Sequence, residues 1–540
     1  MTPTSTPPLL RLDEQLAHWA ARQPARAALI APEATVSFAE LQQRSEAMGK
    51  ELLALGIRPN DVVAFQLPNL IDAFVLYHAA IRIDAIVVPI LPAMRQHDLT
   101  YMMGECCARL LVTVDNWRGF DHALLARNSC GADTLVARVQ PGGTTKPAEK
   151  ALQLIGHGLL PASTNRLPDS VWAQAPADVL DRICSMIFTS GTSGRPKAVT
   201  YSHRNLGIEG REMASVESIR PDDVLFVPPS IAHVSGICFG LYMPMAAGST
   251  VCLMPEWNSD AAIRLIERER CTWTAGATPF LQGIVEAAGR NPDGLKGLRV
   301  FRCGGASVPP ALIRRAREFG IDAYRCYGMS EHPTVSGRAG QTDEACIYSD
   351  GVIHPLVEMI VVDPANPDRL LPPGEAGELA VKGPDQSRGY LREADTASSR
   401  YAGWFLTGDL GCLSADRVVT ITGRKKDIII RKGENIASKE LEDLIAEHPA
   451  VREVAVVGMP DAERGEMVCC VVVPRDGCQP TLADICGHLK NSGVATYKLP
   501  ERLACVPALP HNAGGKVLKT AIKQALAEAL PDQRSLAEPA

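Results

Sequence analysis

The stretch Ile187-Phe-Thr-Ser-Gly-Thr-Ser-Gly-Arg-Pro-Lys-Ala-Val-Thr200 joins an apolar run, a loop of hydroxyl and glycine residues, a lysine and a second apolar run. Glycines let the backbone turn its N–H groups toward an anion. The hydroxyl side chains add donors, and Lys197 adds a positive charge. We therefore expect a buried strand, a loop that holds a polyphosphate and a second strand, with a polar surface turn as the alternative. The loop residues are Thr189, Ser190, Gly191, Thr192, Ser193 and Gly194.

This loop departs from the common nucleotide-binding pattern. That pattern places a lysine directly after its second glycine and a Ser or Thr after the lysine. Here Arg195 and Pro196 separate Gly194 from Lys197. Because proline has a fixed φ and no N–H, a helix is not expected to start at this point.

The composition is that of an ordinary globular protein. The chain has 540 residues, 46% of them hydrophobic and 21% charged, which is enough for several structural units. A net charge of −6 provides no basic field that would attract nucleic acid. None of the 16 cysteines lies in a Cys-x-x-Cys spacing, so reduced thiols are expected. With neither a secretory signal nor a long apolar segment, the sequence favours a cytoplasmic protein without stable membrane insertion.

The order of apolar segments predicts an α/β fold. Buried-strand runs at 62–67, 85–90 and 110–114 alternate with helical stretches, and the same rhythm resumes at 224–227, 249–253 and 298–303. This alternation is typical of parallel sheets covered by helices. From 374 to 421 the pattern changes to short strands, which predicts a small β-subdomain. The composition changes again after Gly423, and the remainder predicts a small α+β domain.

Four further segments carry polar residues of functional type. They are Arg325-Cys-Tyr-Gly-Met-Ser-Glu331, Trp404-Phe-Leu-Thr-Gly-Asp409, the run from Gly423-Arg-Lys-Lys-Asp427 to Lys432-Gly-Glu434, and His511-Asn-Ala-Gly-Gly-Lys516. With the first loop, their order and spacing resemble the adenylate-forming superfamily of acyl-CoA synthetases, luciferases and peptide-synthetase adenylation domains. The resemblance extends from about Leu12 to Ala525.

The resemblance implies ATP and Mg²⁺ as ligands. Tyr327 is expected to stack on adenine, Asp409 to accept the ribose hydroxyls with Arg424 beside it, and Glu331 to bind the magnesium ion. The small residues Gly304, Gly305 and Ala306 would let adenine lie close to the backbone. The other residues expected to bind ATP are the loop residues given above with Lys197, Arg325, Cys326, Gly328, Met329, Ser330 and Lys516.

The resemblance also implies two half-reactions carried out in two arrangements of the domains. Lys516 is expected to reach the substrate carboxylate and the α-phosphate, where a positive charge stabilises the developing oxygens. Lys197 is expected to hold the departing β- and γ-phosphates. The implied large domain is 1–423, the hinge is 424–427 with Lys426, and the mobile C-terminal domain is 428–540. Coenzyme A would pass a channel lined by Lys432, Gly433 and Glu434.

The substrate is expected to be an apolar carboxylic acid. By resemblance, His233, Gly236 and Gly304 line the acyl pocket, and the segments 234–241 and 274–280 contain no acidic residue that could pair with an amino group. The sequence is most similar in its pattern to bacterial cyclohexanecarboxylate and medium-chain ligases, so we expect a medium-chain or alicyclic acid. A carrier-protein acceptor, an oxidative luciferase-like reaction and a catalytically silent nucleotide-binding homologue remain alternatives, and a homodimer is possible.

Two positions depart from the family pattern. Asp84 stands where many relatives carry glycine, and His511-Asn-Ala-Gly-Gly515 replaces the more usual Arg-Thr-x-Ser-Gly before Lys516. Neither change removes a reacting group. Both raise a question about loop geometry.

Overall fold

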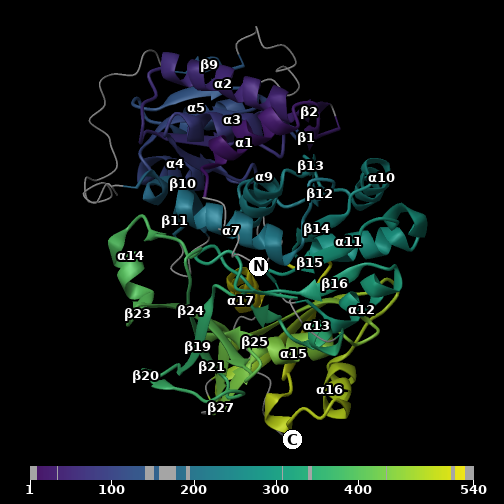
Figure 1. The fold of residues 1–540 in the computed structure, drawn as a ribbon. Helices are drawn as coiled ribbons and strands as arrows, with labels where there is room; N and C mark the ends of the chain where they lie inside the picture. Colours follow the sequence, from purple (N-terminus) through teal and green to yellow (C-terminus); the bar gives the residue numbers. More distant parts are fainter. Residues whose placement is uncertain are drawn as a thin grey trace, which may run out of the picture.

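The computed structural model describes residues 9–32, 34–139, 151–156, 178–189, 195–306, 308–338, 343–432, 434–461, 463–511 and 517–529. Four larger sheets organise this part of the chain. Helices cover the sheets of its N-terminal two thirds, as Figure 1 shows in purple and teal.

The first sheet has eight strands in the order β22-β11-β10-β4-β3-β5-β8-β9. Its central pairs, from β10 to β8, are parallel, and antiparallel pairs close both edges. All five residues of β3 are buried, as expected for a parallel strand covered on both faces. The strands are β3 (Val62–Gln66), β4 (Ile86–Pro89), β5 (Ala108–Thr113), β8 (Leu135–Arg138), β9 (Gln153–Gly156), β10 (Ile183–Thr189), β11 (Lys197–Ser202) and β22 (Gly389–Tyr390).

The second sheet has seven strands in the order β16-β15-β14-β12-β13-β1-β2. Every pair except β1–β2 is parallel, so the carboxyl ends of β12 to β16 meet at one edge. Its strands are β1 (Ala27–Ile30), β2 (Thr35–Ser37), β12 (Val224–Val227), β13 (Thr250–Leu253), β14 (Trp273–Gly276), β15 (Val300–Cys303) and β16 (Asp322–Arg325).

The β-subdomain is an antiparallel sheet of six strands. It contains β19 (Glu358–Asp363), β20 (Asn366–Leu370), β21 (Gly377–Lys382), β23 (Arg400–Tyr401), β24 (Trp404–Leu413) and β25 (Val419–Arg424). Two short hairpins lie elsewhere, β6 (Asn116–Trp117) with β7 (Phe120–Asp121), and β17 (Ser336–Gly337) with β18 (Val352–Ile353).

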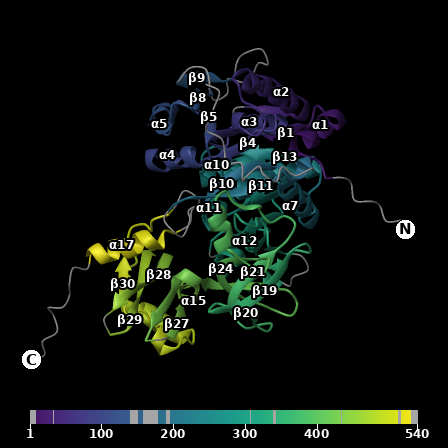
Figure 2. The same ribbon diagram turned by 90° about the vertical axis from the view of Figure 1, so that its left-hand side faces the viewer.

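The last sheet forms a separate lobe beside the β-subdomain, seen in yellow-green in Figure 2. Its strands are β26 (Ile428–Arg431), β27 (Glu434–Ala437), β28 (Val451–Asp461), β29 (Gly465–Pro474) and β30 (Arg502–Cys505). The turn η5 (Lys425–Asp427) joins β25 to this lobe. Lys425 Nζ lies 2.9 Å from Glu378 Oε2 on β21, which ties this connection to the β-subdomain.

Helices pack on these sheets. Those of the N-terminal part are α1 (Leu12–Arg22), α2 (Phe38–Ala54), α3 (Ile71–Arg82), α4 (Gln96–Glu105), α5 (His122–Ser129), α7 (His203–Val216), α8 (Val234–Ile237), α9 (Met243–Ala247), α10 (Ser259–Glu269), α11 (Thr278–Ala288) and α12 (Pro310–Glu318). Those that follow are α13 (Asp343–Tyr348), α14 (Glu393–Ser398), α15 (Ser438–Ile445), α16 (Leu482–Asn491) and α17 (Lys519–Ala529). Capping boxes start α2, at Ser37 with Glu40, and α16, at Thr481 with Asp484.

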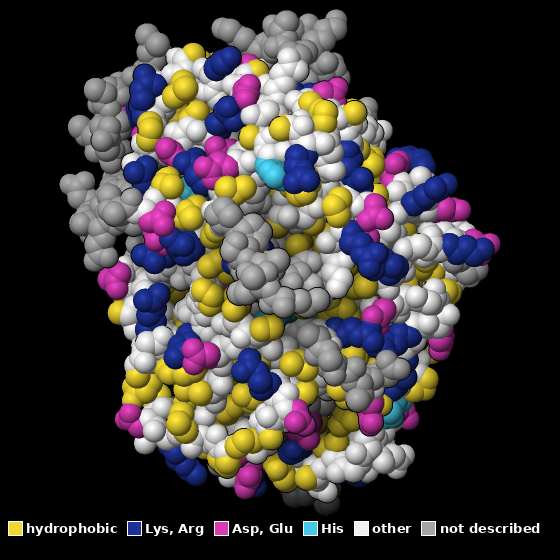
Figure 3. Space-filling model, in the orientation of Figure 1, with side chains coloured by type: hydrophobic (Ala, Val, Ile, Leu, Met, Phe, Trp, Pro, Cys, Tyr) yellow, Lys and Arg dark blue, Asp and Glu magenta, His cyan; other side chains and the backbone are white. Residues whose placement is uncertain are grey.

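The α/β fold with its β-subdomain and small C-terminal α+β part confirms the class expected from the sequence. No helix among the described residues is long and apolar enough to span a lipid bilayer, and the cytoplasmic location stays a prediction. Basic and acidic side chains are interspersed on the face shown in Figure 3.

Asp84 adopts the positive φ that a glycine would adopt at this position. Its φ is +57°, in the left-handed region, and it follows α3 directly before β4. Aspartate tolerates this conformation better than most residues. Its Oδ1 also lies 2.6 Å from Arg11 Nη1, so the side chain gains an ion pair that glycine could not make.

We expect Asp84→Val to lower the free energy of unfolding by about 2 kcal/mol, since a β-branched residue is strained at positive φ. Urea unfolding followed by tryptophan fluorescence would measure this. Asp84→Asn, which tolerates the same φ and loses only the charge, should cost less. Equal losses of unfolding free energy in the two variants would show that the ion pair with Arg11, and not the backbone conformation, accounts for the contribution of Asp84.

Candidate active site

A cavity of about 1090 Å³ lies outside the carboxyl ends of the parallel strands. Segments that follow β12, β14, β15 and β16 line it, together with the end of β10, parts of β24 and the start of β11. In open α/β sheets this edge is where ligands bind, because the loops that leave the strands can be varied there without disturbing the core. Five sequence motifs predicted to be functional lie far apart in the chain, and residues from four of them meet at this cavity.

One end of the cavity carries the groups expected to meet phosphates. Thr189 and Lys197 line it from the two strands that flank the first loop, and Thr189 Oγ1 donates to the carbonyl oxygen of Lys197 at 3.3 Å. Lys197 Nζ lies 2.9 Å from Asp395 Oδ1 and 5.1 Å from the centre of the Tyr390 ring. The Tyr390 hydroxyl donates to Glu331 Oε1 at 2.5 Å. The loop residues Ser190, Gly191, Thr192, Ser193 and Gly194 lie outside the described residues.

The nucleoside end is organised by Asp409, which is buried on β24. Its Oδ2 accepts a hydrogen bond of 2.7 Å from the Tyr327 hydroxyl, and Arg424 Nε lies 2.9 Å from its Oδ1. Burial and the charge of Asp409 raise the pKa of Tyr327, so its hydroxyl remains a donor. Each carboxylate oxygen has a second lone pair, which leaves acceptors for two ribose hydroxyls.

Glycines bring two of the lining segments close together. A Cβ atom on Gly304 would lie 2.6 Å from both the carbonyl oxygen and Sγ of Cys326. Gly305 has a φ of +81°, which favours glycine. Cys326, Gly328, Met329 and Ser330 also line the cavity, while Ala306 is not one of its lining residues.

Aromatic and aliphatic side chains form another part of the cavity. Phe239, Met254, Trp257 and Phe280 line it, and the rings of Trp257 and Phe280 meet edge to face at 4.8 Å between centres. His233 lines the same region, and burial lowers its pKa, so its ring is neutral. Its Nε2 is buried without a hydrogen-bond partner among the described residues.

Two charged residues of the cavity have partners of opposite charge. The buried Arg302 lies 3.0 Å from Glu217 Oε1 through its Nη1 and donates to the carbonyl oxygen of Ser336 at 2.5 Å. Glu256 pairs with Arg118 at 2.9 Å. Arg95 also lines the cavity, and its Nη1 donates to the carbonyl oxygens of Pro92 and Met94.

Several expected site residues do not reach the cavity. Arg325 is buried and donates to Asp350 Oδ1 at 2.8 and 3.1 Å, so its side chain supports the loop instead of lining the cavity. Gly236 is a packing glycine, because a Cβ there would lie 2.0 Å from the carbonyl oxygen of Ser230. Gly236 itself is not among the residues that line the cavity, and its role at the acyl pocket stays a prediction.

The remaining expected residues belong to the C-terminal lobe or to the connection before it. Lys426 lies in η5, and Lys432 and Glu434 lie at the turn between β26 and β27, away from the cavity. Gly433 and Lys516 lie outside the described residues. Roles for these residues stay predictions.

Sequence reasoning missed Tyr390, Asp395 and Trp257, while Phe280 ends the uncharged segment 274–280 that was considered for the acyl pocket. Tyr390 and Trp257 stand in stretches whose pattern gives no sign of a site. Tyr390 approaches Glu331 from 59 positions away in the chain, a contact that only the folded structure reveals.

Glu331 is suited to a magnesium ion that arrives with nucleotide. Within the described residues there is no group of three or more His, Cys, Asp or Glu side chains that could hold a metal ion alone. Mg²⁺ bound with nucleotides commonly takes only one or two protein carboxylates and completes its shell with phosphate oxygens and water. A single carboxylate beside Thr189 and Lys197 fits that donor set.

The fold, with its cavity at the carboxyl ends of the parallel strands, is that of the adenylate-forming ligases. Residues 16–391 match the family described as AMP-binding enzyme, and residues 440–516 match the AMP-binding enzyme C-terminal domain. The chain belongs to the AMP-binding enzyme family. It is an AMP-forming acid ligase, and its family membership implies ATP, Mg²⁺ and coenzyme A as cofactors.

Curated relatives and solved structures agree with this assignment. The chain is 31% identical over 509 residues to a medium-chain fatty-acid–CoA ligase of Escherichia coli, covering 91% of this chain and 86% of the relative. It is 32% identical over 497 residues to a salicyl-AMP ligase / salicyl-S-ArCP synthetase of Mycobacterium tuberculosis, covering 91% and 85%. The crystal structure of ATP-bound MatB from Rhodopseudomonas palustris superposes with a TM-score of 0.82 at 27% identity, covering 96% of this chain and all of the other.

We expect Asp409→Asn to weaken ATP binding by about 10- to 100-fold. The change removes a charged acceptor, and hydrogen bonds to charged groups contribute about 1.5–3 kcal/mol. Tyr327→Phe, which removes one donor to Asp409 and keeps the ring, should weaken binding by about 10-fold or less. Isothermal titration calorimetry with ATP would measure both.

Asp363→Asn provides the control, since Asp363 lies on β19 of the same sheet and pairs with the exposed Arg369. Wild-type ATP affinity in Asp409→Asn would contradict the assignment of this carboxylate to the nucleoside.

Proposed function

We propose that the chain is an ATP-dependent carboxylic acid–CoA ligase that acts on an apolar medium-chain or alicyclic acid. The observation that carries this proposal is the composition of the cavity. The cavity contains the charged residues Lys197, Glu331 and Asp409 together with an apolar wall that includes Trp257 and Phe280.

The proposed reaction has two steps. In the first, a carboxylate oxygen of the acid attacks the α-phosphorus of ATP and displaces pyrophosphate, which gives an acyl-AMP. In the second, the CoA thiol attacks the acyl carbonyl, loses its proton and displaces AMP. Lys197 would stabilise the charge on the leaving pyrophosphate, and Lys516 would stabilise the reacting carboxylate and α-phosphate.

An apolar acid is favoured because aromatic and aliphatic side chains form much of the cavity wall. Arg302 and Glu256 have partners of their own, and His233 is neutral. An amino acid would bring an ammonium group beside Glu256, a carboxylate that is already paired, which is costly. The name of the E. coli relative, a medium-chain fatty-acid–CoA ligase, points in the same direction.

The second step is proposed to occur after the C-terminal lobe rotates about residues 424–427. Lys426 lies in η5, a three-residue turn, and a few residues of this kind can absorb a large change in φ and ψ. Lys432, Gly433 and Glu434 would then approach the cavity and line the path of the pantetheine arm. The domain limits 1–423 and 428–540 follow from this placement of the hinge.

A carrier protein is the alternative acceptor, favoured by the name of the M. tuberculosis relative, which describes a salicyl-S-ArCP synthetase as well as an AMP ligase. Release of AMP and formation of a thioester with free CoA would support the ligase that we propose. Homodimer formation also stays a prediction.

The direct test is a pyrophosphate-release screen over straight-chain, alicyclic and aromatic acids, each with and without CoA. We expect the largest stimulation by apolar acids of medium size and formation of acyl-CoA only when CoA is present. No stimulation by any acid would refute the proposed function. Pyrophosphate release without any acyl-CoA would indicate another acceptor.

Lys516→Ala is expected to slow acyl-AMP formation by about 10²- to 10³-fold, the usual effect of removing one group that stabilises a developing oxyanion. Thioester formation from supplied acyl-AMP should continue, because that step does not involve the α-phosphate attack. Acid-dependent ATP–pyrophosphate exchange measures the first step, and acyl-CoA chromatography the second. Lys523→Ala on α17 is the matched control.

Loss of both half-reactions in Lys516→Ala would instead indicate misfolding of the C-terminal lobe. Exchange at the wild-type rate would refute the role of this lysine.

A further inference from the structure

We propose that Tyr390 and Asp395 are positioning residues that set the directions of Glu331 and Lys197 at the phosphate end of the cavity. This inference rests on the proposed function. It assigns two side chains of the β22–α14 segment to the adenylation step, one acting through the metal-binding carboxylate and the other through the phosphate-binding lysine.

Asp395 and the Tyr390 ring fix the end of the Lys197 side chain. Lys197 Nζ lies 2.9 Å from Asp395 Oδ1 and 5.1 Å from the ring centre. The two charged side chains are only 20% and 26% exposed, so water screens the pair less than it screens a surface pair. Lysine has a flexible stem and three donors, so an ammonium held by one carboxylate still has donors for phosphate oxygens.

The Tyr390 hydroxyl fixes Glu331 in the same way. It donates to Oε1 at 2.5 Å, and the other carboxylate oxygen is left for a cation. Hydrogen bonds of this kind orient metal-binding carboxylates, and their loss typically costs about 10- to 100-fold in metal affinity.

Backbone pairing and hydrogen bonds hold the segment that carries Tyr390 and Asp395, so their contacts do not depend on a loosely held surface loop. Tyr390 pairs with Val199 in the β11–β22 ladder, and β11 begins at Lys197. The Tyr390 N–H donates to Thr396 Oγ1 at 2.9 Å, which ties β22 to α14. The segment between them is held by Arg392, whose guanidinium donates to both oxygens of Glu105 at 2.5 Å.

A purely structural role is the competing explanation. Exposed ion pairs and single hydrogen bonds often contribute only about 1 kcal/mol to stability, and their loss would leave nucleotide and metal dependence unchanged. If both are positioning residues, substitutions of Tyr390 and Asp395 will have different effects. Tyr390 acts on the metal ligand Glu331, and Asp395 acts on the phosphate lysine Lys197.

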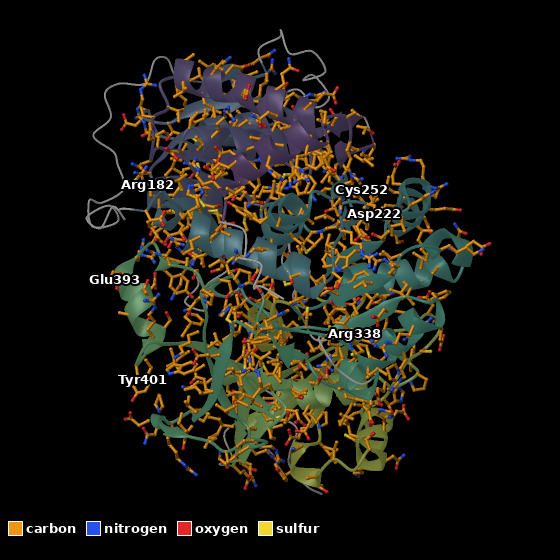
Figure 4. All side chains as sticks on the ribbon, viewed as in Figure 1. Arg182, Asp222, Cys252, Arg338, Glu393 and Tyr401 are labelled. Carbon is orange, nitrogen blue, oxygen red and sulfur yellow. The ribbon has the colours of Figure 1, made fainter. Side chains whose placement is uncertain are left out.

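Tyr390→Phe keeps the ring beside Lys197 and removes only the donor to Glu331. We expect the Mg²⁺ concentration for half-maximal ATP binding to rise about 10-fold. ATP binding in EDTA should stay at the wild-type level. Isothermal titration calorimetry over a series of Mg²⁺ concentrations measures both quantities without catalysis. Tyr401→Phe is the control, because this tyrosine donates to Asp368 and lies at the outer edge of the β-subdomain, labelled in Figure 4.

Asp395→Ala removes the counter-charge of Lys197. We expect the KM for ATP in acid-dependent pyrophosphate exchange to rise about 10-fold, the equivalent of about 1.4 kcal/mol. Asp395→Asn, which keeps an oxygen acceptor, should raise it less. The Mg²⁺ dependence of ATP binding should not move in either variant. Glu393→Gln is the matched control, an exposed charge on the same helix, also labelled in Figure 4.

Wild-type Mg²⁺ dependence in Tyr390→Phe, or a wild-type KM in Asp395→Ala, would overturn the corresponding half of the proposal. Loss of ATP binding in EDTA for Tyr390→Phe would show a structural role and overturn it as well. If the wild-type protein binds ATP but no acid supports exchange, the proposed function fails while the calorimetric comparison still decides the role of Tyr390.

Discussion

The carboxylate of Asp409 is the interaction on which the cavity depends. It joins the loop after β16, through Tyr327, to the end of β25, through Arg424. A buried charge of this kind is costly unless it is paired. Tyr327 and the residue that precedes η5 are therefore held in one arrangement by a single carboxylate. Because Arg424 directly precedes η5, movement of the C-terminal lobe would begin next to the nucleoside.

Elsewhere in the cavity, several charged side chains are compensated by ion pairs. Lys197 is paired with Asp395, Arg302 with Glu217, Lys425 with Glu378 and Arg118 with Glu256. Ionic groups of a substrate that approach these four cations must displace or share their partners. ATP brings several charges and can do this at Lys197, whose ammonium has spare donors. A neutral acyl group requires no such exchange, which supports the proposed apolar acid.

The sequence predicted the fold class and a minority of the residues that line the cavity, for identifiable reasons. Buried strands such as β3 and β12 are continuous apolar runs, and the capping boxes at Ser37 and Thr481 mark helix starts by local hydrogen bonds alone. The phosphate loop and the segment that carries Tyr327 combine residue types that serve few other purposes. These signals depend only on residues that are close in the sequence, so they can be recognised without knowledge of the tertiary structure.

The errors and omissions concern side-chain direction and long-range pairing. Arg325 and Tyr327 lie two positions apart in one motif, yet the first is fixed to Asp350 and the second faces the cavity. Gly236 lacks a Cβ at a point where one would lie against the carbonyl of Ser230, and its place in the acyl pocket stays a prediction. Asp84 departs from the family pattern but keeps the positive φ, which aspartate can adopt, and it adds an ion pair with Arg11.

The two lysines of the proposed mechanism belong to different parts of the chain. Lys197 begins a strand whose neighbour β22 supplies Tyr390, so its surroundings are built into the eight-stranded sheet. Lys516 belongs to the C-terminal part, which is joined to the rest through the three residues of η5. A group that stabilises leaving pyrophosphate is best fixed in advance, since preorganised charges cost no reorganisation during the reaction. If the C-terminal lobe rotates as proposed, a lysine needed in only one half-reaction would leave with it and open the acyl carbonyl to the thiol.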